Sequence, residues 1–332
     1  MTSDDDKKST KGWKEHLLRS GVPLEYQVAL IMTSEGMTAR ADFSFLRRDL
    51  SGSKECSVDI DSTWYGPTSN ILKFELHVLV ECKYRSPDKV VLFFEEPNDP
   101  DFSPVTLGGT VSYFDTFVPY HLPLNAFVSL EQDFPFVYKG VEVFERGAVE
   151  EDLRHGIQQL RYATPAFLRS ILDAQLFGNF PSEATALFFS RILVTNAPLL
   201  LLRRGLGVED IKTASSIQDV STPVDTVILF SDYGPDFEDH VRSAFQSDLD
   251  SRLERAGIFT EYLKGEGKKF RFRDNPIELL QSLAMANRFE CKAISTQFFV
   301  TTLTGLLPLL RELKESCKNS YRNRSKRRRR SS

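Results

Sequence analysis

A thirteen-residue alternation of apolar and polar side chains, over residues 73–85, constrains the fold of this chain more than any other feature of the sequence. Its apolar positions are Phe74, Leu76, Val78, Val80 and Cys82. The intervening positions are Lys73, Glu75, His77, Leu79, Glu81, Lys83 and Arg85. A period of two residues is typical of a β-strand with one face in a core. The segment therefore predicts a long strand that ends in a group of charged side chains.

A second alternating segment, residues 55–61, precedes this strand. Cys56, Val58 and Ile60 are expected on one face, and Ser57, Asp59 and Asp61 on the other. The connection between the two segments contains Gly66, Pro67, Ser69 and Asn70, which are turn-forming residues. We expect the two strands to be adjacent and antiparallel.

Helical periodicity and further apolar runs predict the remaining elements. A helix should begin near Pro23 and stop near Gly36. Another should cover residues 150–173, with Pro165 kinking or splitting it. Buried strands are predicted at 191–202 and 226–231, and helices at 236–256 and 275–313. The uncharged stretch 293–310 contains six Ser, Thr or Gln residues and favours a buried core helix over a membrane span.

Charge is distributed unevenly along the 332 residues. The formal net charge is -4, but residues 318–330 contain eight Lys or Arg and no acidic residue, which leaves -12 for the rest. We expect residues 318–332 to form a disordered basic tail. Such a tail is consistent with a solvated end, with an electrostatic contact to nucleic acid, or with a nuclear-import-like signal if the cell is eukaryotic.

The four cysteines are widely spaced and the N-terminus is polar, so we expect reduced thiols and a cytoplasmic protein.

The two alternating segments bring together residue types that can perform chemistry. If the strands pair, Asp59 or Asp61 lies near Glu81 and Lys83 at the sheet surface. Carboxylate pairs suit Mg²⁺ or Mn²⁺, and a lysine beside the cation can orient a water molecule. These groups would serve metal-assisted phosphodiester hydrolysis. A Glu-x-Lys on an exposed strand face is more often only solvated, and the preceding pair of aspartates is what favours a site here.

The stretch from Val58-Asp59-Ile60-Asp61 to Glu81-Cys82-Lys83-Tyr84-Arg85 resembles the active-site core of the PD-(D/E)XK nuclease superfamily, of the Mrr and RecB-nuclease type. The resemblance implies a restriction-endonuclease-like core, built in the order helix, three strands, helix, strand. It also implies that Asp59 and Glu81 bind metal and that Lys83 assists the attacking water. Asp61 is the alternative to Asp59 as ligand, and the Cys82 carbonyl is a further candidate.

Two more positions match patterns of that family. Glu25, in the first helix, occupies the place of a glutamate that many members add, although an acidic residue there also suits the helix dipole. Gln158 and Tyr162 match the Q-x-x-x-Y pattern of RecB-type members, with ordinary helix packing as the alternative. The long stretch between Lys83 and this helix departs from the family pattern.

Together these features predict an α/β protein: a mixed central sheet flanked by helices, with a mostly helical C-terminal extension. The expected organisation is a polar N-terminal segment at 1–19, a nuclease-like core at 20–204 with an insertion at 86–149, an extension at 205–317, and the tail. The expected function is that of a Mg²⁺- or Mn²⁺-dependent endonuclease, with DNA favoured over RNA as substrate. The alternatives are a catalytically weak or inactive nucleic-acid-binding or regulatory module on the same fold, and an interaction protein. The sequence leaves open whether a homodimer forms, and no membrane partner is expected.

Overall fold

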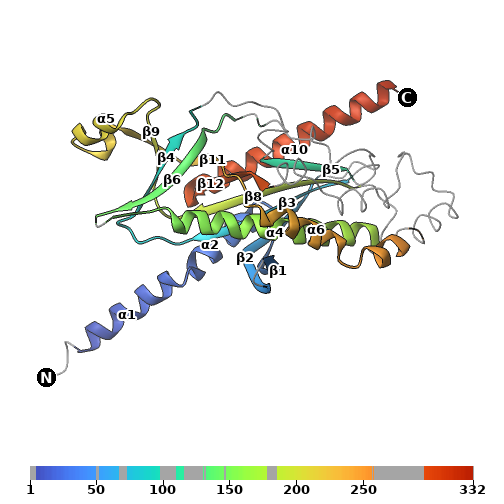
Figure 1. Ribbon diagram of the computed structural model, residues 1–332, viewed down its shortest axis with the longest axis horizontal. Coiled ribbons are helices and arrows are strands. Elements are labelled where there is room, and N and C mark those ends of the chain that lie inside the picture. The colour runs from blue at the N-terminus through green and yellow to red at the C-terminus, as the bar shows by residue number, and fades with distance from the viewer. Residues whose placement is uncertain are drawn as a thin grey trace.

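One mixed β-sheet forms the centre of the molecule, as the computed structural model shows (Figure 1). The structure describes residues 5–49, 52–66, 73–97, 110–115, 130, 132–145, 147–177, 185–255, 257 and 295–331. Within these ranges the sheet has twelve strands, and ten of them follow the order β1-β2-β3-β8-β12-β11-β6-β4-β9-β10. The remaining two, β5 and β7, pair with β8 and β6.

The strands are β1 (Thr38–Asp49), β2 (Gly52–Tyr65), β3 (Lys73–Lys83), β4 (Val90–Glu95), β5 (Val111–Asp115), β6 (Phe136–Phe144), β7 (Gly147–Val149), β8 (Thr185–Thr195), β9 (Leu199–Leu202), β10 (Ser221–Val224), β11 (Thr226–Phe230) and β12 (Gln297–Thr302). The helices are α1 (Asp5–Arg19), α2 (Val22–Ser34), α4 (Glu151–Phe177), α5 (Val208–Thr213), α6 (Asp236–Gln246) and α10 (Leu303–Ser331), with a 3₁₀ turn at Ile217–Asp219.

Strands β1, β2 and β3 form an antiparallel meander, and β8 then lies parallel to β3. The connection from β3 to β8 passes through α4, as a crossover between parallel strands requires. The predicted antiparallel pairing of the two alternating segments is therefore confirmed, with Ile60 opposite Val80 and Asp61 opposite Leu79. The prediction of an α/β fold with a mixed sheet flanked by helices is also confirmed.

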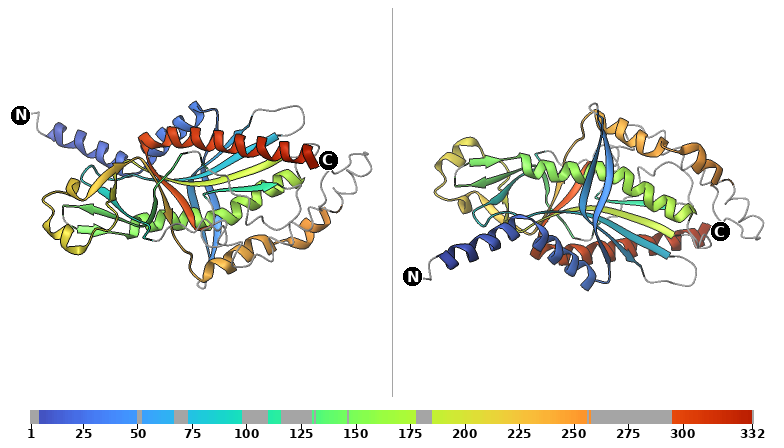
Figure 2. Two further views of the ribbon diagram at one scale, coloured as in Figure 1. Left: turned by 90° about the horizontal axis from the view of Figure 1, so that it is seen from above. Right: turned by 90° about the horizontal axis from the view of Figure 1, so that it is seen from below.

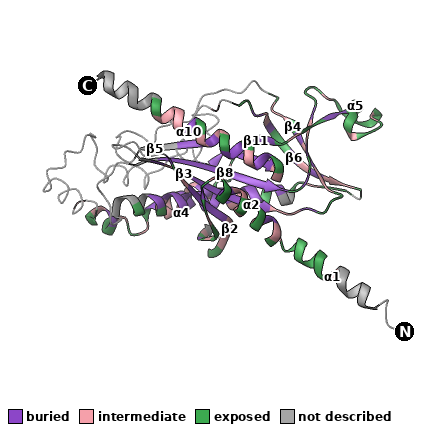
Figure 3. Ribbon diagram, turned by 180° about the vertical axis from the view of Figure 1, so that it is seen from behind, coloured by how far each residue is buried: buried purple, intermediate pink, exposed green. Residues whose placement is uncertain are grey.

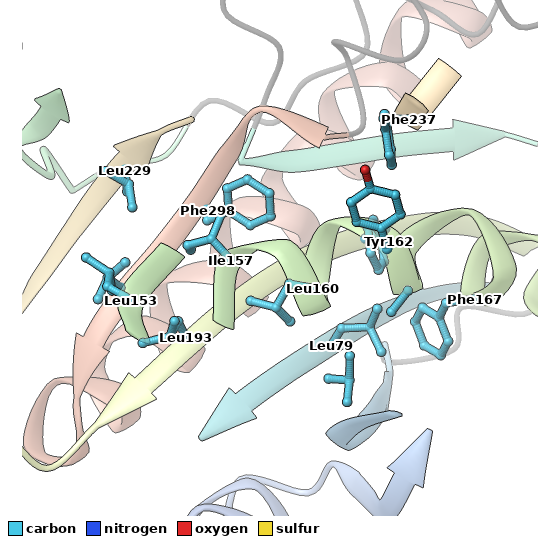
Figure 4. Packing of buried hydrophobic residues seen from close by; sticks show 14 of the residues in the cluster. Leu79, Leu153, Ile157, Leu160, Tyr162, Phe167, Leu193, Leu229, Phe237 and Phe298 are labelled. Carbon is cyan, nitrogen blue, oxygen red and sulfur yellow. The ribbon is translucent and has the colours of Figure 1, made fainter. Parts of the chain in front are cut away.

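Helices cover both faces of the sheet (Figure 2). Helix α4 packs on one face, where its apolar residues meet β3, β8 and α6 (Figure 4). These α4 residues are Leu153, Ile157, Leu160, Phe167, Leu168 and Ile171. Helices α2 and α10 cover the opposite face, through Leu24, Val28 and Met32 of α2 and the leucines at 306, 309, 310 and 313. Each such side chain contributes about 1.5–3 kcal/mol on burial, so the two layers hold the sheet between them.

Helix α1 projects away from this layered body, and its side chains from 13 to 19 are exposed (Figure 3). In Figure 1, α1 and the end of α10 point in opposite directions. None of the described helices is long and apolar enough to cross a membrane.

Several elements differ from the sequence-based expectation. Strand β1 was not predicted. The stretch 293–310, expected as a core helix, contains β12 instead, and α10 starts only at Leu303. The reason is local: the run of Phe298, Phe299 and Val300 fits a strand buried on both faces, and the Thr302 hydroxyl then accepts a hydrogen bond from the Gly305 N–H at the start of the helix.

Helix α4 continues through Pro165 as one helix rather than two. The inserted segment 86–149 does contain short strands, as predicted, but β4 and β6 belong to the central sheet. The C-terminal extension likewise supplies β10, β11 and β12 to that sheet, so its described part is less helical than expected.

The basic tail, expected as disordered, instead continues α10 as far as Ser331. Its beginning is held by packing. Cys317 is fully buried and Tyr321 lies beside the ring of Phe74, with the ring centroids 5.0 Å apart. A helix anchored in this way can extend through residues such as Lys and Arg, which are good helix formers.

Candidate active site

The end of β3 presents Glu81 and Lys83 toward α4. The Lys83 ammonium donates to Glu81 Oε1 at 2.6 Å and to Gln159 Oε1 at 2.9 Å. Gln159 in turn donates from Nε2 to the Ser57 carbonyl of β2 at 3.3 Å. The Glu81 side chain is 1% exposed and that of Lys83 is 20% exposed, so the pair is fixed near the surface but largely removed from water.

A glycine in α4 allows this arrangement. A Cβ atom at Gly156 would lie 2.7 Å from Leu193 Cδ1 and 3.0 Å from Lys83 Cε. A larger residue would therefore displace the end of the Leu193 side chain on β8 and press on that of Lys83. Gly156 was not singled out from the sequence, because a lone glycine in a helical pattern carries no sign of what it contacts.

Asp59 joins this pair from the neighbouring strand. Its Oδ2 accepts a hydrogen bond of 2.6 Å from the Cys82 backbone N–H, the residue between Glu81 and Lys83. The Cys82 side chain lies in the core on the α2 and α10 side, where burial raises the pKa of its thiol. The structure therefore brings Asp59, from the middle of β2, together with Glu81 and Lys83 at the end of β3.

The alternation predicted for residues 55–61 is wrong in one respect. Cys56 and Val58 pack on the α4 side of the sheet, whereas Ile60 packs on the α2 and α10 side. The β1–β2 register pairs Ala41 with Ile60 and Phe43 with Val58, and the ladder is interrupted between these two pairs. A local irregularity of this kind changes which face a side chain occupies.

Asp61 lies apart from the Glu81–Lys83 pair. It accepts hydrogen bonds from Arg40 across the β1–β2 ladder, at 2.9 Å from Nε and 2.7 Å from Nη2. Of the two aspartates left open by the sequence, Asp59 is thus the one placed beside Glu81.

Several carboxyl groups lie close together at this site, and they are partly or fully removed from water. Burial, and then the charge of Asp59, raise the pKa of Glu81 to about 8. Burial also raises the pKa of Asp59, against the hydrogen bond from Cys82 and the charge of Lys83. Glu25 lies in the first turn of α2, and its pKa is also raised, first by burial and then by the negative charges of Asp59 and Asp42. Four acidic residues therefore share one lysine.

The carboxylates of Asp59 and Glu81 have the chemistry of a divalent-cation site, although the described side chains do not form a complete coordination shell for a cation. Glu81 Oε2 is buried and makes no hydrogen bond within the described structure. Mg²⁺ and Mn²⁺ prefer hard carboxylate oxygens, and in this group the acidic side chains outnumber the single lysine. In the described part of the chain, however, no three His, Cys, Asp or Glu side chains lie close enough together to hold a metal ion. Asp59 and Glu81 are the residues that could hold a cation.

The Q-x-x-x-Y residues occupy other places. Gln159, rather than Gln158, contacts Lys83. The Tyr162 hydroxyl donates to Asp236 Oδ2 at 2.6 Å, and its ring lies under the Arg47 guanidinium, 3.9 Å from the centroid. Figure 4 shows Tyr162 directed toward Phe237 of α6. Tyr162 therefore joins α4 to α6 and β1 rather than reaching the carboxylates.

Sequence reasoning missed Gln159, Gly156 and Asp42. Comparisons with protein-family models, with curated proteins and with solved structures found no match to this chain.

Proposed function

We propose that this chain is a Mg²⁺- or Mn²⁺-dependent nuclease with a restriction-endonuclease-like core, and that it hydrolyses phosphodiester bonds in nucleic acid, DNA in preference to RNA. The observation that supports this most strongly is the meeting of Asp59 on β2 with Glu81 and Lys83 at the end of the neighbouring strand β3. Two carboxylates and a lysine, partly shielded from water, are the groups that metal-assisted phosphodiester hydrolysis requires.

The connectivity around these residues also supports the proposal. The chain order α2, β1, β2, β3, α4, β8 matches the helix, three strands, helix, strand order that the resemblance implies. The same strands are consecutive neighbours in the sheet, β1-β2-β3-β8. Of the inserted strands, β4, β6 and β7 join other parts of the sheet and β5 pairs with β8, and none of them stands between two members of this order.

Each residue has a distinct part in the proposal. A divalent cation, when bound by Asp59 and Glu81, would neutralise phosphate charge and make a bound water more acidic. Lys83 offers its ammonium to a water or a phosphate oxygen, and Gln159 fixes the direction of that ammonium. Gly156 lets α4 lie close to Lys83 and so limits the entry of bulk water.

A nucleic-acid-binding module with weak or no catalysis is the second candidate. Two observations favour it. The Lys83 ammonium is already shared between Glu81 and Gln159, and the described carboxylates do not close around a cation. In this case the same surface would bind a phosphate backbone without cleaving it.

A cleavage assay separates the two candidates. Purified protein is incubated with Mg²⁺ or Mn²⁺ and with single-stranded DNA, duplex DNA, methylated duplex DNA or RNA. Lys83→Ala is assayed beside Lys139→Ala, a control that removes an exposed lysine paired with Glu150. The nuclease proposal predicts cleavage by wild type and control, and a loss of about 100-fold or more for Lys83→Ala. Cleavage unaffected by Lys83→Ala contradicts the assignment; binding without cleavage by the wild type favours the module.

A further inference from the structure

The interruption of the β1–β2 ladder involves both strands. On β1, Ala39 packs on the α2 and α10 side and Phe43 on the α4 side, although four residues separate them and a regular strand would place both on one face. On β2, Val58 and Ile60 change sides in the same way. The two residues between the flanking pairs are Asp42 and Asp59, and the charge of Asp42 is one of the influences that raise the pKa of Asp59.

Asp42 has an unusual backbone at this point. Its φ is +57°, in the left-handed region, and among described residues other than glycine only Asp248 shares this feature. Aspartate and asparagine adopt this region more readily than other residues with a side chain. The Asp42 side chain is exposed, whereas Glu81 is buried, so Asp42 lies at the solvent side of the carboxylate group.

The charge around Asp42 is not compensated. Counting only side chains that the structure describes, Glu25, Asp42 and Asp59 form no ion pair, and Lys83 is bonded to Glu81. Other acidic residues nearby are paired, as Asp61 is with Arg40 and Glu35 is with Lys314 and Arg311. The unbonded, buried oxygen of Glu81 adds an independent sign that a ligand is missing from this group.

We propose that Asp42 is a cation-positioning residue of this site, whose carboxylate, set opposite Asp59 by the left-handed backbone of β1, holds the water shell of a divalent cation bound to Asp59 and Glu81. Mg²⁺ keeps several of its waters when one or two carboxylates bind it, and an exposed carboxylate beside it can accept hydrogen bonds from those waters. This inference rests on the part of the proposed function that assigns a divalent cation to the site, and it does not require that the protein cleaves nucleic acid.

Titration of MnCl₂ into the protein by calorimetry tests the inference without an activity measurement. The variant is Asp42→Asn, because asparagine tolerates the left-handed backbone and removes only the charge. The matched control is Glu55→Gln, an exposed carboxylate on the same strand as Asp59. Loss of a residue that orients bound waters or ligands weakens metal affinity by about 10-fold or more, and we expect this for Asp42→Asn and no change for Glu55→Gln.

Thermal unfolding in excess chelator supplies a second measurement. Removing one of several like charges should leave the unfolding midpoint of Asp42→Asn equal to or above that of the wild type, which excludes misfolding as the cause of weaker binding. A midpoint below that of the wild type would contradict the inference, since it would assign Asp42 a structural role.

The outcomes distinguish this inference from the proposed function. Equal Mn²⁺ affinity of wild type and Asp42→Asn overturns the role of Asp42, even if the wild type cleaves nucleic acid. Weaker binding by Asp42→Asn in a protein that cleaves no substrate supports the role of Asp42 and contradicts the nuclease. A wild type that binds no Mn²⁺ overturns the inference, while cleavage that persists in chelator overturns the metal dependence of the proposed nuclease.

Discussion

Two buried glutamates in the same sheet, Glu81 on β3 and Glu142 on β6, have opposite surroundings. Each is 1% exposed. Glu142 accepts from Arg85 Nε at 2.7 Å through Oε1, and its Oε2 lies 3.4 Å from Lys89. Glu81 bonds Lys83 through one oxygen only, and its other oxygen has no hydrogen bond in the described structure. A fully paired acid stabilises a fold, whereas an acid left half-paired is typical of a site where a ligand completes the set.

Arg85→Met should produce the largest change, because it leaves Glu142 buried with only the more distant Lys89. We expect the free energy of unfolding to fall by about 3–5 kcal/mol, measured by urea denaturation. The double variant Arg85→Met, Glu142→Leu should recover much of this loss, since it removes both charges. Lys212→Met, which breaks an exposed pair with Glu209, is the control and should change stability by less than about 0.5 kcal/mol. An Arg85→Met effect as small as that of the control would remove the contrast between the two glutamates.

The pH dependence of stability should reveal the incomplete pairing of Glu81. Its pKa is raised from 4.5 to about 8 in the folded state, so the folded state holds a proton that the unfolded state releases between these values. Stability in chelator should therefore fall as pH rises from about 5 to 8. In Glu81→Gln this fall should be smaller, as measured by urea unfolding at the two ends of the range. A parallel fall in both proteins would assign the pH dependence to other groups.

Gly156→Ala should disturb the site through packing alone. The added methyl group would crowd Leu193 and Lys83, at a cost of about 1–3 kcal/mol, and the helix preference of alanine offsets about 1 kcal/mol of it. We expect a small loss of stability and lower cleavage activity. Gly12→Ala, in α1 with no atom within 4 Å of the new Cβ, is the helical control and should be neutral or stabilising. Equal behaviour of the two variants would show that α4 has room at Gly156.

The smallest expected effect separates two neighbouring glutamines. Gln159→Ala removes the bond to Lys83 and should lower cleavage by about 10-fold, while the unfolding midpoint changes little. Gln158→Ala should leave cleavage unchanged, because Gln159 is the neighbour that contacts Lys83. A loss of activity confined to Gln158→Ala would instead favour the role that the Q-x-x-x-Y pattern implies.

The parts of the fold that were predictable have strong periodicity. The alternation over 73–85 placed β3 and the nearness of an aspartate to Glu81 and Lys83, and apolar spacing placed α2. Strand β1 was missed although residues 39–45 alternate, because two of its four apolar positions are alanines and Leu46 is followed by two arginines. Strand β12 was assigned to a helix because a short apolar run has no period that separates a buried strand from a buried helix.

The finer parts of the site depend on tertiary contacts that no local pattern contains. Adjacent residues of a helix point about 100° apart, so a glutamine pair does not show which member faces the sheet. The position of Asp42 follows from an interruption of the ladder, and that interruption exists only once β1 and β2 are paired. The importance of Gly156 likewise appears only when α4 lies on β3.

The two ends of α10 lie near opposite ends of β3, and the distance between them can be compared with the length of a nucleic-acid duplex. Lys83, Thr195 and Thr302 lie in one row across β3, β8 and β12, so α10 begins at the end of the sheet that carries Lys83. It then returns across the sheet to Tyr321, beside Phe74 at the start of β3. From Phe74 to Lys83 a strand covers about 30 Å, which corresponds to about nine base-pair steps of a duplex. Because Lys83 faces α4 and α10 covers the opposite face of the sheet, a polyanion in contact with Lys83 would have to pass that edge of the sheet to meet the basic end of α10.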